Sequence, residues 1–136
     1  MQYIISDCTV VDVENGCAAL PHTDVYVRGK IIEKIVPHGA PDRGCKVIDA
    51  SGKFAVPGLV NLHAHLFGTG RPSKALGGGK AQQRLLRFIQ TPPGKKILGK
   101  MVESSAKNEL YSGVTTVRAV GDLFGSDIAL KYRIES

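Results

Sequence analysis

The sequence has 136 residues, of which 43% are hydrophobic and 22% charged, a balance that excludes an intrinsically disordered protein. No apolar run is long enough to cross a membrane, and the start lacks the basic and apolar regions of a signal peptide. Its three cysteines form no Cys-x-x-Cys pair, which indicates reduced thiols. We therefore expect a cytoplasmic protein with no membrane partner. A complete eight-stranded (β/α) barrel needs about 250 residues and is excluded.

The positive charge is concentrated in the second half of the sequence. The net charge is +6, and the segment from Arg71 to Lys100 holds eight cations and no acid. Such a segment can bind an anionic partner or form a solvated helix surface, and Phe88 alone offers no platform for stacking bases. We therefore expect no nucleic-acid partner. A basic, non-catalytic module that binds nucleic acid or a protein stays the alternative to an enzyme.

The first third of the sequence predicts β structure. Runs rich in β-branched residues are separated by turn signals, at 3–5, 9–13, 24–27, 31–36 and 46–49. The third and fourth runs flank Arg28-Gly29-Lys30 and predict a hairpin. Short strands with a turn about every ten residues suggest a small, sandwich-like sheet.

The rest of the sequence predicts alternating strands and helices. An almost continuous apolar run over 54–66 is typical of a strand buried on both faces, and a second strand is expected over 114–120. Three segments predict helices, over 82–90, 95–111 and 126–135. Thr91-Pro92-Pro93-Gly94 is expected to break the first helix. This order predicts parallel strands joined by a right-handed crossover.

His63-Ala64-His65 is the strongest candidate for chemistry. Residues two apart on a strand point to the same face, so both imidazoles can bind one metal ion at nitrogen–metal distances of about 2.0–2.1 Å. The alternative is a pair of histidines that hydrogen-bond to neighbours. The position at the carboxyl end of a strand, before a glycine-rich loop, favours a site. His22 and His38 lie beside prolines and are expected to be exposed loop residues.

This motif lies in a longer segment with a family resemblance. Val56-Pro57-Gly58-Leu59-Val60-Asn61-Leu62-His63-Ala64-His65 resembles the first barrel strand of the amidohydrolase superfamily, whose pattern is P-G-hydrophobic-hydrophobic-D-x-H-x-H. Residues 24–32 and 47–53 are similar to the N-terminal sandwich strands of that family. Residues 113–118 resemble its second barrel strand, most closely in the imidazolonepropionase-related and metal-dependent dipeptidase branch.

The resemblance implies an α/β fold in which a partial β-sandwich is followed by the first two β/α units of an incomplete TIM (β/α)8 barrel. The N-terminal strands of a composite β-sandwich then occupy 1–55, and the start of a metal-dependent hydrolase barrel occupies 56–136. The remaining metal ligands and the general base of the family have no counterpart in the sequence. We therefore expect an N-terminal fragment that is inactive by itself and self-associates through unpaired strand edges. One chain of a split hydrolase is a further possibility.

The resemblance also implies the chemistry of the site. His63 and His65 would bind the more buried metal, usually Zn²⁺, in a family that uses one or two divalent ions. Water activated by the metal hydrolyses C–N bonds of small amides, cyclic amides or dipeptides. Asn61 replaces the commoner aspartate and shares the strand parity of the histidines. We expect Asn61 to orient the histidines and not to bind the metal.

Three further residues are weaker candidates for a contact with substrate or with the metal ligands. Asp122 follows the second predicted strand at its carboxyl end, where α/β proteins place their sites. Arg84 and Arg87 are three residues apart on a predicted helix, so both could lie on one face and hold a substrate carboxylate.

Overall fold

The computed structural model describes residues 2–39, 44–68 and 77–135, and the chain divides into two compact units, Met1–Pro57 and Gly58–Ser136. We call these the sheet unit and the barrel unit and describe each by itself. Within the described residues, no helix combines the length and the apolar character that crossing a membrane requires.

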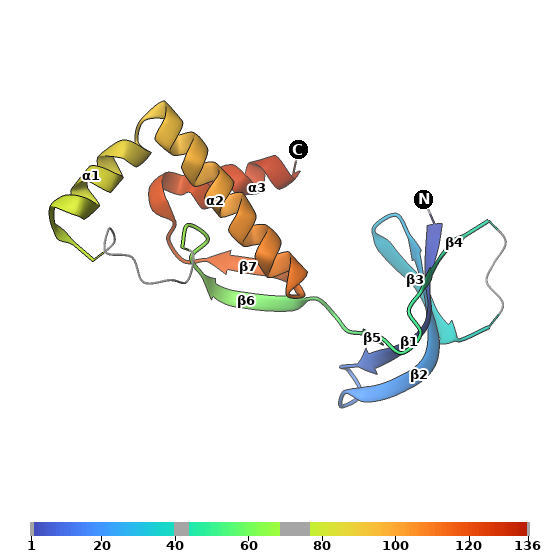
Figure 1. Ribbon diagram of the computed structural model, residues 1–136. Coiled ribbons are helices and arrows are strands. Elements are labelled where there is room, and N and C mark those ends of the chain that lie inside the picture. The colour runs from blue at the N-terminus through green and yellow to red at the C-terminus, as the bar shows by residue number, and fades with distance from the viewer. Residues whose placement is uncertain (1, 40–43, 69–76, 136) are drawn as a thin grey trace. The chain divides into compact units, whose positions relative to one another are not determined.

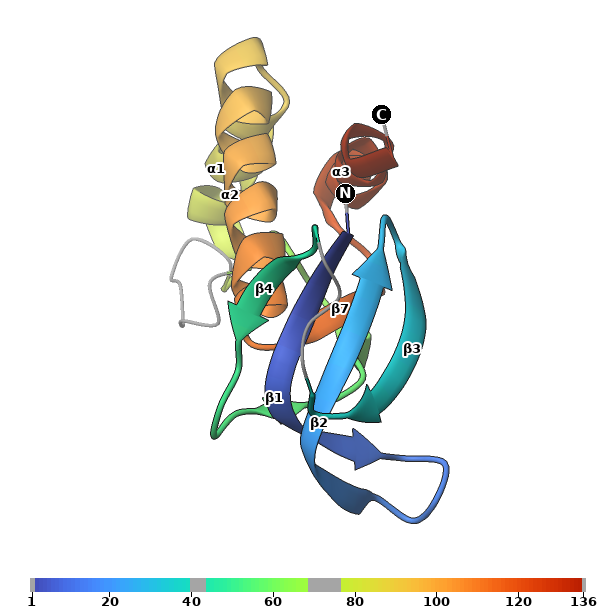
Figure 2. The same ribbon diagram turned by 90° about the vertical axis from the view of Figure 1, so that its right-hand side faces the viewer.

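The sheet unit contains one five-stranded sheet (Figure 2). Its strands are β1 (Gln2–Asp12), β2 (Ala18–Arg28), β3 (Ile31–Pro37), β4 (Lys46–Asp49) and β5 (Phe54–Ala55). β2 is antiparallel to both β1 and β3, which confirms the predicted hairpin, and β4 and β5 pair parallel with β1. The core consists of alternating residues, Cys8, Val10, Val25, Val27 and Ala50.

β1 is one continuous strand and not two separate runs, because Ser6 and Asp7 form a β-bulge within it. Ile5 pairs with Val25 and Cys8 with Thr23, so these two residues of β1 lie opposite the single Asp24 of β2. Asp7 has a φ of 59°, as expected where a bulge bends the strand. The bulge places the polar groups of β1 next to the Asp24 carboxylate.

The barrel unit confirms the predicted strand–helix–strand–helix order (Figure 1). Its elements are β6 (Leu59–Ala64), α1 (Gly79–Ile89), α2 (Pro92–Tyr111), β7 (Val114–Ala119), the 3₁₀ turn η2 (Leu123–Gly125) and α3 (Ser126–Glu135). β6 and β7 are parallel. The core is apolar and joins the strand ends to the helices through Ala64, Leu66, Ile89, Leu98, Val102 and Leu130.

Two expectations about this unit were wrong. β6 is not buried on both faces, because Leu59, Val60 and Leu62 are 54%, 57% and 66% exposed. The helices cover only one face of the β6–β7 pair (Figures 1 and 2). The first helix ends at Ile89, before Thr91-Pro92-Pro93-Gly94, as expected, but α2 starts at Pro92 and not at Lys95. Proline is well suited to the first helical turn, and the Thr91 side chain caps the helix by accepting from the Gly94 amide.

Candidate functional site

The two histidines of the predicted metal site lie together at the carboxyl end of β6. Their ring centroids are 5.3 Å apart with an angle of 76° between the ring planes, and both residues are exposed. Nδ1 of His65 is 3.0 Å from the carbonyl oxygen of Gly121. Because a carbonyl oxygen can only accept a hydrogen bond, the proton of the neutral ring lies on Nδ1. The lone pair of Nε2 then makes no hydrogen bond to the described residues. His65 is therefore held in a tautomer that can bind a metal.

Asn61 connects the β6 strand to helix α2. Its Nδ2 donates to both carboxylate oxygens of Glu109, at 3.2 and 3.3 Å, and its Oδ1 accepts from the backbone N–H of His63 at 3.1 Å. Sequence reasoning expected Asn61 to support the histidines but missed Glu109. The two residues are 48 positions apart, and no motif in the sequence joins them.

Asp122 lies at the same strand ends as the histidines. Its Oδ1 accepts from the backbone N–H of Phe67 at 3.4 Å. Its Oδ2 is buried and, like Ser126 Oγ, has no hydrogen-bond partner in the described part of the chain. Burial is the main cause that raises the pKa of Asp122 above the ordinary aspartate value. Asp122 thus stabilises the turn after β6 and presents a carboxyl group with unused hydrogen-bonding capacity.

Arg84 and Arg87 are both exposed on α1. No hydrogen bond or ion pair joins either guanidinium to another residue among those described, so the structure does not connect them to the histidine pair. The N-terminal part of the basic segment, with Arg71 and Lys74, lies outside the described residues.

The donor set decides how well the site fits a metal ion. Residues 2–39, 44–68 and 77–135 contain no cluster of three or more His, Cys, Asp or Glu side chains able to hold a metal. A catalytic zinc site normally has three protein ligands and an open position. Two neighbouring imidazoles have the chemistry to supply two of these ligands, and the described residues place no third ligand beside them.

No family model matches the chain. Dihydroorotase of Staphylococcus aureus is 41% identical over 54 residues, which are 40% of this chain and 12% of that protein. Dihydroorotase of Bacillus pumilus is 31% identical over 123 residues, covering 79% of this chain and 28% of the relative. The solved structure of a Xaa-Pro dipeptidase superposes with a TM-score of 0.75 at 24% identity, over 99% of this chain and 30% of the dipeptidase. Over most of its length, the chain is therefore similar to the N-terminal portion of amidohydrolases.

The aligned region covers only part of each relative. The chain spans between about one eighth and one third of each of these relatives and corresponds to their N-terminal portion. The sheet unit and the β/α units together match the N-terminal part of amidohydrolase structures, which confirms the predicted α/β fold class.

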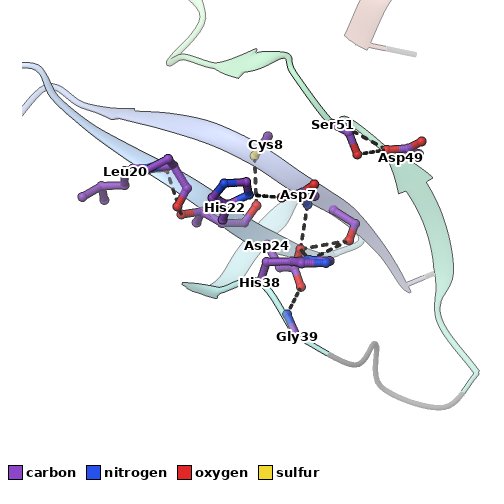
Figure 3. A network of polar contacts seen from close by, with 12 residues as sticks. Asp7, Cys8, Leu20, His22, Asp24, His38, Gly39, Asp49 and Ser51 are labelled. Carbon is purple, nitrogen blue, oxygen red and sulfur yellow. Dashed lines mark hydrogen bonds and ion pairs between the residues drawn. The ribbon is translucent and has the colours of Figure 1, made fainter.

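The sheet unit contains a polar network that sequence reasoning did not predict (Figure 3). The Asp24 side chain is 2% exposed and accepts from Ser6 Oγ, from the backbone N–H groups of Asp7 and Gly39, and from His38 Nδ1, at 2.8 to 3.2 Å. Burial alone would raise the pKa of Asp24, but these hydrogen bonds outweigh it and lower the pKa to about 2. Because every partner comes from the same unit, the network is structural.

Proposed function

We propose that this chain supplies two metal ligands, His63 and His65, to a metal-dependent hydrolase of C–N bonds, and that it does not hydrolyse such bonds by itself. The observation that carries the proposal is the pairing of the two imidazoles at the carboxyl end of β6, with the His65 tautomer set by Gly121. The relatives support the type of reaction, since their names describe enzymes acting on dihydroorotate and on Xaa-Pro dipeptides. The proposed substrate class is therefore small amides, cyclic amides or dipeptides.

The described residues have distinct roles in this proposal. The Nδ1–H group of His65 donates a hydrogen bond to the carbonyl oxygen of Gly121, which leaves the lone pair of Nε2 available to a metal. Asp122 fixes the turn after β6 through the Phe67 amide and is the candidate for a contact with substrate or with the metal ligands. A bound zinc ion would supply Lewis acidity and would lower the pKa of a bound water to about 7. The third ligand and the general base would have to come from elsewhere.

The proposal is tested by titrating the purified chain with Zn²⁺ and with Co²⁺, whose visible absorption reports its coordination. We expect weak binding with a stoichiometry of one metal per site, and a loss of affinity of at least about tenfold in His63→Ala and in His65→Ala. His22→Ala is the matched control, because this histidine is also exposed but lies in the sheet unit. Equal zinc affinity in all four proteins would contradict the metal role.

Activity assays separate the proposal from its rivals. The chain should not turn over dihydroorotate or a Xaa-Pro dipeptide with Zn²⁺ present, and robust turnover would overturn the claim that it is inactive alone. Co-purification of a second chain that restores turnover would indicate a split hydrolase. Steeply salt-dependent DNA or RNA binding that survives loss of both histidines would favour the nucleic-acid module instead.

We also propose that the open face of β6 promotes self-association. Leu59, Val60 and Leu62 present apolar side chains next to the unpaired edges of a two-stranded sheet. Sedimentation velocity should show oligomers that increase with protein concentration and decrease in Leu62→Ser. A monomer at all concentrations would contradict this expectation.

A further inference from the structure

The backbone of β6 is irregular at the metal-ligand motif. Asn61 pairs with Val117 and Ala64 with Ala119, so β6 uses one residue more than β7 between these two positions. The extra residue is a bulge at Leu62 and His63, and bulges re-aim side chains and interrupt the ladder of backbone hydrogen bonds. The His63 N–H is accepted by the side chain of Asn61 at this point. The direction of the first imidazole therefore depends on the orientation of the Asn61 amide.

The orientation of that amide is set by helix α2. An asparagine amide can rotate by half a turn and exchange its oxygen and nitrogen, and only its partners decide which way it faces. Glu109 presents two carboxylate oxygens, which can only accept, so Nδ2 must face α2. Oδ1 then faces the His63 N–H. Asn61 and Glu109 are both half-buried, so water competes less for the two hydrogen bonds between them.

We propose that Glu109 is a positioning residue for the metal-ligand strand, acting on His63 through Asn61. This inference rests on the proposed function in that it assigns a metal-binding role to His63. It also explains why position 61 carries an amide where the resembled pattern has an aspartate. An aspartate there would face the Glu109 carboxylate at about 3 Å, and two carboxylates at that distance repel each other.

The proposal predicts that residues 61 and 109 depend on each other. Asn61→Asp places two carboxylates together, whereas adding Glu109→Gln supplies an amide that can donate to the new carboxylate. In the double variant the second oxygen of that carboxylate can still accept from the His63 N–H. The double variant, in which position 109 donates and position 61 accepts, should therefore restore the geometry that Asn61→Asp alone disturbs.

The experiment measures two quantities in the full chain for wild type, Glu109→Ala, Asn61→Asp, the double variant and Glu103→Gln. The first is the exchange rate of the His63 amide proton in the metal-free protein, followed by NMR. The second is the affinity for Zn²⁺. Glu103→Gln is the matched control, because Glu103 is also on α2 but pairs with Lys107 and Arg133.

We expect Glu109→Ala and Asn61→Asp to speed exchange of the His63 amide by about tenfold and to weaken zinc binding by about tenfold. The double variant should recover most of both losses, and Glu103→Gln should leave the His63 amide as in wild type. Unchanged His63 exchange in Glu109→Ala, or no recovery in the double variant, would overturn the inference. If wild type binds no zinc, the proposed function fails, while the exchange rates still test the positioning by themselves.

Discussion

In the sheet unit, the Asp24 carboxylate is held by several hydrogen bonds, whereas in the barrel unit the two imidazoles of the candidate site are exposed and make few hydrogen bonds to the described residues. Asp24 is buried with four donors around it, and His38 and Ser6 both contact it. His65 has one hydrogen bond through Nδ1, and the His63 ring has none to the described residues. A buried group with every bond satisfied holds a fold together, while an exposed ring with a free nitrogen is available to a ligand.

Two residues of the sheet unit, Asp7 and His22, have strained backbone conformations. Asp7 and His22 have φ values of 59° and 49°, and their side chains hydrogen-bond to each other at 2.8 Å across β1 and β2. A backbone conformation of this kind costs about 1 kcal/mol or more and persists only where surrounding bonds hold it. At Asp7 and His22, strain and polar pairing, which often indicate active sites, occur together in the unit that lacks the metal motif, while Phe124 of the barrel unit also has a positive φ, of 55°. The partners of Asp7 and His22 show that they stabilise the bulge of β1.

The largest effect should come from removing Asp24. Asp24→Ala leaves the backbone N–H groups of Asp7 and Gly39 and the Ser6 hydroxyl without their acceptor, which should cost about 3 kcal/mol. Hydrogen–deuterium exchange should show the loss in peptides of Met1–Pro57 and not in those of Gly58–Ser136. Asp49→Ala is the control, since this exposed aspartate hydrogen-bonds to its near neighbour Ser51 and its removal should change stability far less. Equal losses in both units would contradict the view that Asp24 stabilises the sheet unit alone.

Gly94→Ala should give the largest effect in the barrel unit, by about 2 kcal/mol. A β-carbon at this buried position would clash with the Phe88 carbonyl oxygen and lie 2.7 Å from the Ile89 α-carbon, and backbone atoms cannot move aside as a flexible side chain can. The junction of α1 and α2 thus depends on close backbone contact in addition to the hydrogen bonds of Thr91. Thermal melting followed by helix circular dichroism would measure the loss. An unchanged midpoint would show that the junction can open without cost.

The strand and helix order of the barrel unit could be predicted because each element has a local signal. The apolar run of β6, the helical spacing in α2 and the β-branched run of β7 all depend on near neighbours in sequence. The exposure of Leu62 could not be predicted in the same way. An apolar run indicates that a strand can be buried on both faces, but the number of covering layers depends on the tertiary structure.

In the candidate site, too, the sequence predicts the features that depend on near neighbours and misses those that depend on the tertiary structure. The side-chain parity of His63 and His65 follows from strand geometry, so their proximity was predictable. The partners Glu109 and Gly121 come from α2 and from the end of β7, and they reach the motif only after the crossover has formed. The Asp24 network was missed for a related reason, because a bulge in β1 determines which groups lie opposite Asp24.

Acid should remove about 2 kcal/mol of stability from the sheet unit through Asp24. The pKa of Asp24 is lowered from 3.8 to about 2, so its contribution is present above pH 3.8 and is lost as the pH falls towards 2. The hydrogen bond to Asp24 raises the pKa of His38 above 6.5, so that contribution is complete below pH 6.5 and is lost as the pH rises through the raised value. Unfolding followed by exchange of sheet-unit peptides should show maximal stability between these limits, and Asp24→Asn should flatten the profile.

Salt provides the control for this pH profile. Glu103 in the barrel unit also has a pKa lowered to about 2, by hydrogen bonds from Lys107 and Arg133, but its side chain is 32% exposed. Salt screens such a surface pair much more than a buried one. Raising the salt concentration should therefore weaken the acid response of the barrel unit and leave that of the sheet unit nearly unchanged. Equal screening in both units would show that Asp24 is more accessible than its burial indicates.

The smallest expected effect is a gain in stability. Gly99 lies inside α2, and a β-carbon built there meets no atom within 4 Å. Gly99→Ala should stabilise the barrel unit by about 0.5–1 kcal/mol, because alanine loses less backbone entropy than glycine in a helix. Melting of Gly99→Ala beside Gly94→Ala compares the same substitution five residues away on the same helix. A rise in the first midpoint and a fall in the second would show that backbone contact with α1, and not helix propensity, determines the response of α2; a fall in both would contradict the open surroundings of Gly99.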